Sequence, residues 1–228
     1  MLSYLFLFTV PVCSYAQNES LKFEHIGTSE GLSQINVNCI IQDSRGFMWV
    51  GTRNGLNRYD GYKFITFRNN TKDPHSLSNN MIIDLVEDRQ GNVWVATQFG
   101  LNKYDRKTGS FIRYQHRDQD NKSLSDNLIN HLMIDHTGDL WVATQNGGLD
   151  RFDMKSGIFL HHQHADFNEK SISDNNVRSI YEDSQHNLWV GTATSGLNIY
   201  DQKTNTFSRI MSKDPSKNIT AYNITCIF

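Results

Sequence analysis

The sequence has 228 residues, enough for one large domain or two small ones. Its 22 basic and 24 acidic residues nearly balance, which excludes a basic nucleic-acid-binding surface as the organising feature. With 38% hydrophobic and 11% aromatic residues the chain has enough apolar side chains to fold, and three cysteines exclude a disulfide scaffold.

Residues 1–16 are predicted to be a secretory signal peptide. Met1–Val12 is apolar and uncharged, and Ser14 and Ala16 give the small-x-small pattern that precedes a cleavage site. We therefore expect cleavage after Ala16 and export of the remaining chain. A lipid anchor on Cys13 is the alternative, but the residues just before it do not suit one. No apolar run reaches the about 18–20 residues of a membrane-spanning helix, so no span is expected.

One sequence unit occurs four times along the chain. Its tryptophans lie 45, 47 and 48 residues apart, at Trp49, Trp94, Trp141 and Trp189. An aspartate precedes each tryptophan by six residues, at Asp43, Asp88, Asp135 and Asp183. A glycine or alanine follows each tryptophan by two residues, and a Leu-Ser or Ile-Ser pair precedes each aspartate by eleven. Regular self-similarity of this kind indicates a repeat architecture.

Each unit is predicted to form four short strands, because apolar runs of four to six residues alternate with Gly, Asn and Asp. Four strands in 45–48 residues match a blade of a β-propeller. We therefore predict an all-β fold, an incomplete β-propeller over residues 17–228. The predicted blades span residues 32–70, 77–117, 124–165 and 172–212, and a fifth copy begins at 219–228.

The residues common to all four units are predicted to be structural rather than functional. The tryptophans should fill the space between neighbouring sheets, at a cost of about 3–5 kcal/mol when one is truncated. The four aspartates stand before a tight turn and are expected to accept hydrogen bonds from its backbone. A ligand site would need such residues in some blades only.

The repeated motif Asp-x-x-Gly-x-(Leu/Met/Val)-Trp-Val-(Gly/Ala)-Thr, followed by Gly-Leu-Asn-x-Tyr-Asp, resembles the two-component regulator propeller repeat. Gly31-Leu32-Ser33 and the segment from Asp43 to Trp49 resemble the start of the periplasmic sensor region of hybrid two-component systems. The resemblance implies a periplasmic sensor of glycan breakdown products, attached in its relatives to a membrane span, a histidine kinase and a regulator. This sequence shows none of the three and fewer blades, so a truncated chain is expected.

The search for catalytic chemistry gives no motif for a nucleophile, a phosphate loop or a zinc protease. The cluster His161-His162-x-His164 supplies too few ligands for a metal site and is read as an exposed outer strand. We expect no metal, no cofactor and no catalytic residue. A propeller enzyme, a lyase or glycosidase acting on polysaccharide, remains the alternative, and it would need paired carboxylates on one face.

The positions where the repeats differ are the better candidates for binding. The loops between the second and third strands should lie on one face of the propeller, where amide, guanidinium and aromatic side chains suit an oligosaccharide. The candidate ligand-binding residues are Arg53, Asn54, Gln98, Phe99, Gln145 and Asn146. The alternative is that these side chains are solvated loop tips.

Three interpretations of the whole chain therefore remain: a non-catalytic sensor propeller, an enzyme, and a non-functional truncated gene product. An incomplete ring would leave two blade faces open, with Leu21–Ile26 and Ile219–Phe228 unpaired. Open apolar faces promote association. We expect self-association through them, and no nucleic-acid partner.

Overall fold

The computed structural model describes residues 23–210 and 223–227, and apart from the 3-10 turn η1 (Thr28–Glu30) their regular structure is β-strand. The predicted signal peptide and its cleavage after Ala16 lie outside the described residues. So does the start of the fifth copy, Ile219 and Thr220. In the part of the chain that is described, no helix has the length and apolar character to cross a membrane.

Sixteen strands form four antiparallel sheets, each with its strands in chain order. The first blade contains β1 (Val37–Gln42), β2 (Met48–Thr52), β3 (Gly55–Tyr59) and β4 (Phe64–Phe67). The second contains β5 (Ile82–Glu87), β6 (Val93–Thr97), β7 (Gly100–Asp105) and β8 (Ser110–Tyr114). The third contains β9 (Ile129–Ile134), β10 (Leu140–Thr144), β11 (Leu149–Asp153) and β12 (Ile158–His162). The fourth contains β13 (Val177–Glu182), β14 (Leu188–Thr192), β15 (Leu197–Asp201) and β16 (Thr206–Arg209).

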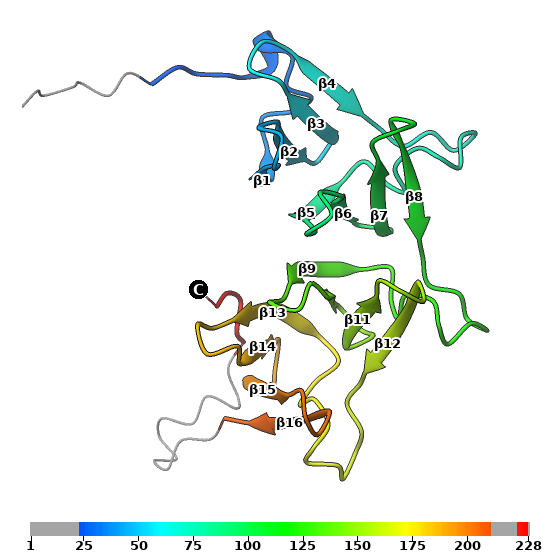
Figure 1. The fold of residues 1–228 in the computed structure, drawn as a ribbon, viewed down its shortest axis with the longest axis vertical. Helices are drawn as coiled ribbons and strands as arrows, with labels where there is room; N and C mark the ends of the chain where they lie inside the picture. Colours follow the sequence, from blue (N-terminus) through cyan, green and yellow to red (C-terminus); the bar gives the residue numbers. More distant parts are fainter. Residues whose placement is uncertain (1–22, 211–222, 228) are drawn as a thin grey trace, which may run out of the picture.

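The four sheets stand side by side in an arc, with their first strands toward the concave side and their fourth strands outside (Figure 1). The first strands of neighbouring sheets contact one another, β1 with β5, β5 with β9 and β9 with β13. The prediction of an all-β fold built from four four-stranded blades is confirmed.

The core lies between the blades. Trp49 packs against Tyr104 of the second blade, and the clusters around Trp94 and Trp141 repeat this arrangement with the third and fourth. The first three tryptophans are at most 1% exposed, whereas Trp189 in the last blade is half-buried. At Gly51 an added Cβ would come 2.7 Å from Ile82 of the next blade. The glycine therefore permits the close approach of the two sheets.

Each repeated aspartate binds both its turn and its tryptophan. Asp43 accepts the backbone N–H groups of Arg45 and Phe47 at 3.0 Å and the indole N–H of Trp49 at 2.8 Å. The three other blades repeat the Trp–Asp bond at 2.8–2.9 Å. Burial alone would raise the pKa of Asp43, but these hydrogen bonds outweigh it and lower the pKa. Asp43 is therefore a fixed charge at the edge of the first blade interface.

The two ends of the arc differ. At the amino end, Ile40 of β1 is 55% exposed, although its counterparts Leu85 and Leu132 are each 4% exposed. Residues 23–27, before η1, form no strand. At the carboxyl end, Ile224 donates its N–H to the carbonyl of Thr192 at 3.0 Å. Its side chain packs against Gly191, as that of Ile82 packs against Gly51. Residues 223–227, beside β13 and β14 in Figure 1, therefore cover part of the last blade.

Candidate ligand-binding face

A polar relay fixes the loops at one end of every blade. In the first blade the side chain of Asn57 accepts the N–H of Ser33 at 3.0 Å and donates to its hydroxyl at 2.8 Å. The Ser33 hydroxyl lies 2.9 Å from that of Thr52, which starts the loop between β2 and β3. The second and fourth blades repeat the relay with Ser78 and Ser173. We call the loop between the second and third strands of a blade its inner loop. The Leu-Ser segment and the inner loop therefore lie on the same face of the propeller.

Backbone bonds extend this face from one blade to the next. Gly55, at the end of the first inner loop, donates its N–H to Asn80 of the second blade at 2.8 Å. Gly100 and Gly148 bind Asn127 and Asn175 of the following blades in the same way, at 2.8 and 2.9 Å. The inner loops of successive blades are thus held at equivalent positions, and they present their side chains as a row.

The six candidate residues occupy the inner loops of the first three blades. Arg53, Asn54 and Gln98 are exposed, Phe99 is 51% exposed, and Gln145 is half-buried. Asn146 is exposed but engaged, since its backbone and side-chain N–H groups both donate to Asp126 at 2.9 Å. The structure places the six on one face, in three separate loops, and the cavity described below lies elsewhere.

The third blade departs from the relay because Asp150 replaces the asparagine. Its carboxylate is fully buried, accepts the N–H of Ser125 at 2.8 Å and lies 2.7 Å from Nδ1 of His161. Burial raises the pKa of Asp150, and the hydrogen bond that the ring of His161 donates to Asp150 raises the pKa of His161. The other ring nitrogen of His161 meets the carbonyl of Asn121 at 2.9 Å, so both nitrogens are occupied by structural contacts.

His161 and His162 end the outer strand β12, as predicted, but the prediction that His161-His162-x-His164 is exposed is wrong, because all three histidines are half-buried. His162 stacks on Trp141 with ring centroids 5.6 Å apart, where the first blade stacks Phe67 on Trp49 at 5.9 Å. Burial lowers the pKa of His162 to about 4. Strand alternation alone does not show this, because the outer strand packs against the following blade.

One cluster of titratable side chains was not predicted from the sequence. His136, in the turn between β9 and β10, and His186, in the turn between β13 and β14, stack with ring centroids 4.0 Å apart. Glu182 of β13 accepts hydrogen bonds from the backbone and ring of His136, the former at 2.7 Å. The three line a cavity of about 450 Å³. His136 and Glu182 are 46 residues apart, about one repeat, and that spacing is the signal for contact across a blade interface.

The chain matches a family model described as "Two component regulator propeller" in four places, residues 31–54, 76–99, 123–146 and 171–194. Each match runs from the Leu-Ser segment through the inner loop, the part of the blade that builds the candidate face. A histidine kinase from Formosa agariphila is 48% identical over 63 residues, 28% of this chain and 5% of the kinase.

Two solved structures of extracellular domains of hybrid two-component systems from B. thetaiotaomicron are similar to this chain. One is 30% identical with a TM-score of 0.61, over 83% of this chain and 32% of that domain. The other is 26% identical with a TM-score of 0.64, over 77% and 25%. Virginiamycin B lyase from Staphylococcus aureus, at 14% identity, a TM-score of 0.58, and 80% and 58% coverage, shares the fold alone. The chain spans at most a third of the two extracellular domains.

Proposed function

We propose that this chain, whose four repeats match the two-component regulator propeller model, is a non-catalytic sensor segment of a hybrid two-component system. The observation that supports the proposal most is the similarity to extracellular domains of two such systems across three quarters or more of this chain. A signal peptide over residues 1–16 would export the chain to the periplasm. The kinase and regulator would then belong to the rest of such a system.

We propose that the sensor recognises breakdown products of complex glycans through the candidate face. Arg53, Gln98 and Gln145 offer hydrogen-bond donors for sugar hydroxyls or carboxylates, and the half-exposed ring of Phe99 offers a stacking surface. The fixed spacing of the inner loops favours an extended ligand with several sugar units. A weak interaction at each blade would add to the others.

The test is to measure the binding of defined oligosaccharides to the chain by calorimetry or by the shift in its melting temperature. We expect Arg53→Ala and Phe99→Ala each to weaken binding at least fivefold. Gln90→Ala and Tyr62→Ala are the matched controls, because both residues are exposed in turns at the opposite end of the blades. Equal binding by all four variants would exclude the candidate face. Saturable binding that only the controls disturb would move the site to the other face.

The non-catalytic part of the proposal follows from how the buried carboxylates are used. The repeated aspartates bind tryptophans and turn backbone, and Asp150 binds Ser125 and His161. Asp135 shares a cavity with a second carboxylate, that of Glu182, but its own oxygens accept hydrogen bonds from Thr137 and Trp141. Incubation with polysaccharides and analysis of the products tests this point, since release of shorter or unsaturated sugars would indicate an enzyme.

Self-association through the open amino-terminal face is also a proposal. Ile35 and Ile40 are 73% and 55% exposed there, at positions that the inner blades bury or half-bury. Exposed apolar surface of this kind drives association. We expect light scattering to show assemblies of the chain that the change Ile40→Glu dissociates. A monomeric chain whose state the substitution does not alter would contradict the proposal.

A further inference from the structure

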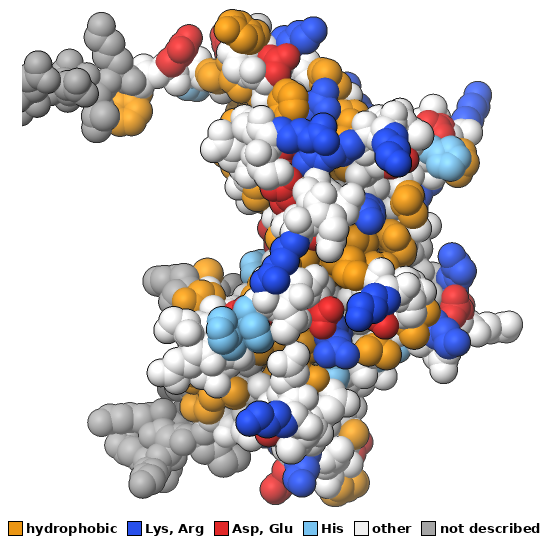
Figure 2. Space-filling model, in the orientation of Figure 1, with side chains coloured by type: hydrophobic (Ala, Val, Ile, Leu, Met, Phe, Trp, Pro, Cys, Tyr) orange, Lys and Arg blue, Asp and Glu red, His pale blue; other side chains and the backbone are white. Residues whose placement is uncertain are grey.

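We propose that His136, Glu182 and His186 form a binding site for a divalent transition-metal ion, zinc being the first choice, between the third and fourth blades. One ligand atom from each residue lies within 4.8 Å of the other two. Imidazole nitrogen and carboxylate oxygen are the ligands of zinc sites that hold three protein groups and leave one position for water or a ligand. Histidine side chains form a pale blue patch over the last two blades in Figure 2.

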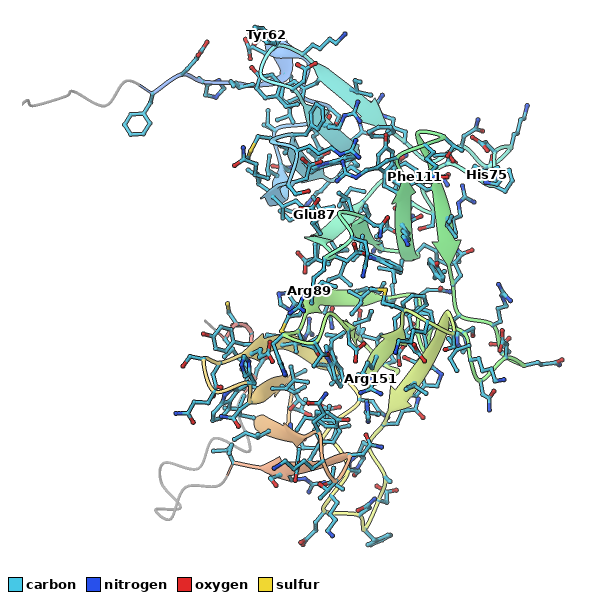
Figure 3. The ribbon with its side chains drawn as sticks, viewed as in Figure 1. Tyr62, His75, Glu87, Arg89, Phe111 and Arg151 are labelled. Carbon is cyan, nitrogen blue, oxygen red and sulfur yellow. The ribbon has the colours of Figure 1, made fainter. Side chains whose placement is uncertain are left out.

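The corresponding place between the first two blades shows what the cluster replaces. There Glu87, which lies between the first and second blades in Figure 3, binds the backbone and hydroxyl of Ser44 at 2.7 and 2.8 Å. Arg106, in the turn between β7 and β8, completes the arrangement. Its guanidinium meets Asp43 at 3.0 Å and Glu87 at 3.1 Å. A permanent positive charge therefore bridges two carboxylates that are largely buried and offsets part of their negative charge.

Between the third and fourth blades the two carboxylates remain and the arginine does not. Asp135 and Glu182 stand where Asp43 and Glu87 stand, but Gln202 takes the place of Arg106. The Asp135 carboxylate accepts hydrogen bonds from the hydroxyl of Thr137 and the indole N–H of Trp141. Lys203 also lines the cavity, yet within the described residues neither carboxylate forms an ion pair with a lysine or arginine.

The middle interface supports this interpretation. There the glutamate position holds Ile134 and the arginine position holds Met154, and both pack against the apolar cluster around Trp94. Glutamate and arginine are thus present together or absent together in the first two interfaces. The third interface alone keeps the glutamate without the arginine, and it alone surrounds that glutamate with two histidines. A bound dication supplies the missing charge, and the histidines supply its ligands.

The position of His186 adds a further observation. The other three turns carry Gly46, Gly91 and Gly138 there, with φ between 77° and 94°, and His186 adopts φ 64°. A Cβ added at Gly91 would lie 3.5 Å from both Glu87 and Ser44. A side chain at this position therefore points at the glutamate and at the preceding blade. In the fourth blade that side chain is an imidazole, whose Nδ1 lies 3.6 Å from Glu182.

The proposed ion would join two blades, since His136 belongs to the third and the other two ligands to the fourth. Zinc bonds of about 2.0–2.2 Å place tetrahedral ligands about 3.4 Å apart. His186 Nδ1 already lies 3.6 Å from Glu182, whereas the hydrogen-bonded pair of His136 and Glu182 would have to separate to admit the ion. His186 is 58% exposed, so the open coordination position would face solvent. The site lies at the opposite end of the blades from the candidate ligand-binding face, and the inference does not rest on the proposed function.

The test uses the untagged chain and zinc alone, titrated by calorimetry in a buffer without phosphate. We expect one equivalent to bind, and the melting temperature to rise with zinc but not with magnesium, which prefers oxygen ligands. His186→Gly is the decisive variant, because it installs the residue of the other three turns and should fold normally. We expect its zinc affinity to fall at least tenfold, and that of Glu182→Gln likewise.

Two further variants control for unspecific binding. Gln202→Arg reproduces the arginine of the second blade and is expected to abolish zinc binding while keeping all three ligands. His75→Ala removes an exposed histidine from another loop, and Cys226→Ser an exposed thiol; both are expected to leave binding unchanged. Absence of saturable binding, or equal affinity in His186→Gly and the unchanged chain, would overturn the proposal.

Discussion

The first and third blade interfaces share one apolar framework and differ in their polar groups. Trp49 and Trp141 each meet a tyrosine of the next blade edge-on, Tyr104 at 5.0 Å and Tyr200 at 5.1 Å. Against this background the third interface exchanges Phe67 for His162, Arg106 for Gln202 and Gly91 for His186. The three exchanges alter the polar groups around the glutamate and the tryptophan, and both interfaces keep their tryptophan.

This comparison separates the contacts that every blade interface needs from the polar groups that are specific to one interface. The apolar contacts hold neighbouring blades together, so they recur in each interface. The charged groups around Glu87 and Glu182 can differ, provided that the negative charge of the glutamate is compensated. In the first interface the balance is internal to the protein. In the third interface no arginine or lysine of the described residues balances the glutamate, and the proposed metal ion would do so. Substitutions that exchange groups between the two interfaces test this division.

The largest effect is expected from the shared framework. Trp49→Ala and Trp141→Ala should each lower the free energy of unfolding by about 3–5 kcal/mol, because each removes a fully buried indole and a hydrogen bond to its aspartate. Urea denaturation measures both. Trp189→Ala is the control, since this tryptophan is half-buried and should cost less. Equal losses at all three positions would mean that burial between blades is not what stabilises the indole.

Removing the internal cation should be nearly as costly. Arg106→Ala leaves Asp43 and Glu87 without their guanidinium, and we expect a loss of about 3 kcal/mol in the free energy of unfolding. The matched control is Gln202→Ala at the same position of the last blade, where we expect less than about 0.5 kcal/mol. Similar losses for the two variants would remove the distinction between the interfaces.

The repeat is the reason that the fold could be predicted from the sequence and the cluster could not. A period of 45–48 residues with Trp, Asp and Gly at fixed offsets determines four blades without any knowledge of their packing. The 46-residue spacing of His136 and Glu182 is consistent with a contact between neighbouring blades, but it does not show which turn of one blade reaches which strand of the next. The burial of His162 was not predicted for the same reason. Strand alternation shows which face of the sheet a side chain lies on, but it does not show that the ring of Trp141 packs against that face.

A smaller effect is expected on acidification. The pKa of His162 is lowered to about 4 in the folded state, against 6.5 for an unperturbed histidine, so the unfolded chain takes up the proton first. The free energy of unfolding should therefore fall as the pH drops through 6.5 toward 4. The loss between pH 7 and pH 5 should be about 2 kcal/mol from this residue.

The variant His162→Phe restores the residue of the first blade and should remove this part of the pH dependence. Phe67→His is the reciprocal change, and it should introduce a similar dependence into the first interface. Urea midpoints at pH 7 and pH 5 measure both. If the parent and His162→Phe lose the same stability over this range, the titrating group lies elsewhere.

The smallest effect concerns the backbone at His186, measured with a chelator present so that no metal contributes. An L-residue in the left-handed region costs about 1–2 kcal/mol, and glycine avoids this cost but loses more conformational entropy on folding. His186→Gly should therefore raise the free energy of unfolding by about 0.5 kcal/mol. His186→Ala separates the two contributions, because it removes the imidazole but keeps the strained backbone. We expect the glycine variant to be the more stable of the two, and an alanine variant of equal stability would show that the turn stores no strain. In the first interface the same turn already carries Gly91, so Gly91→Ala should be destabilising there by a similar amount.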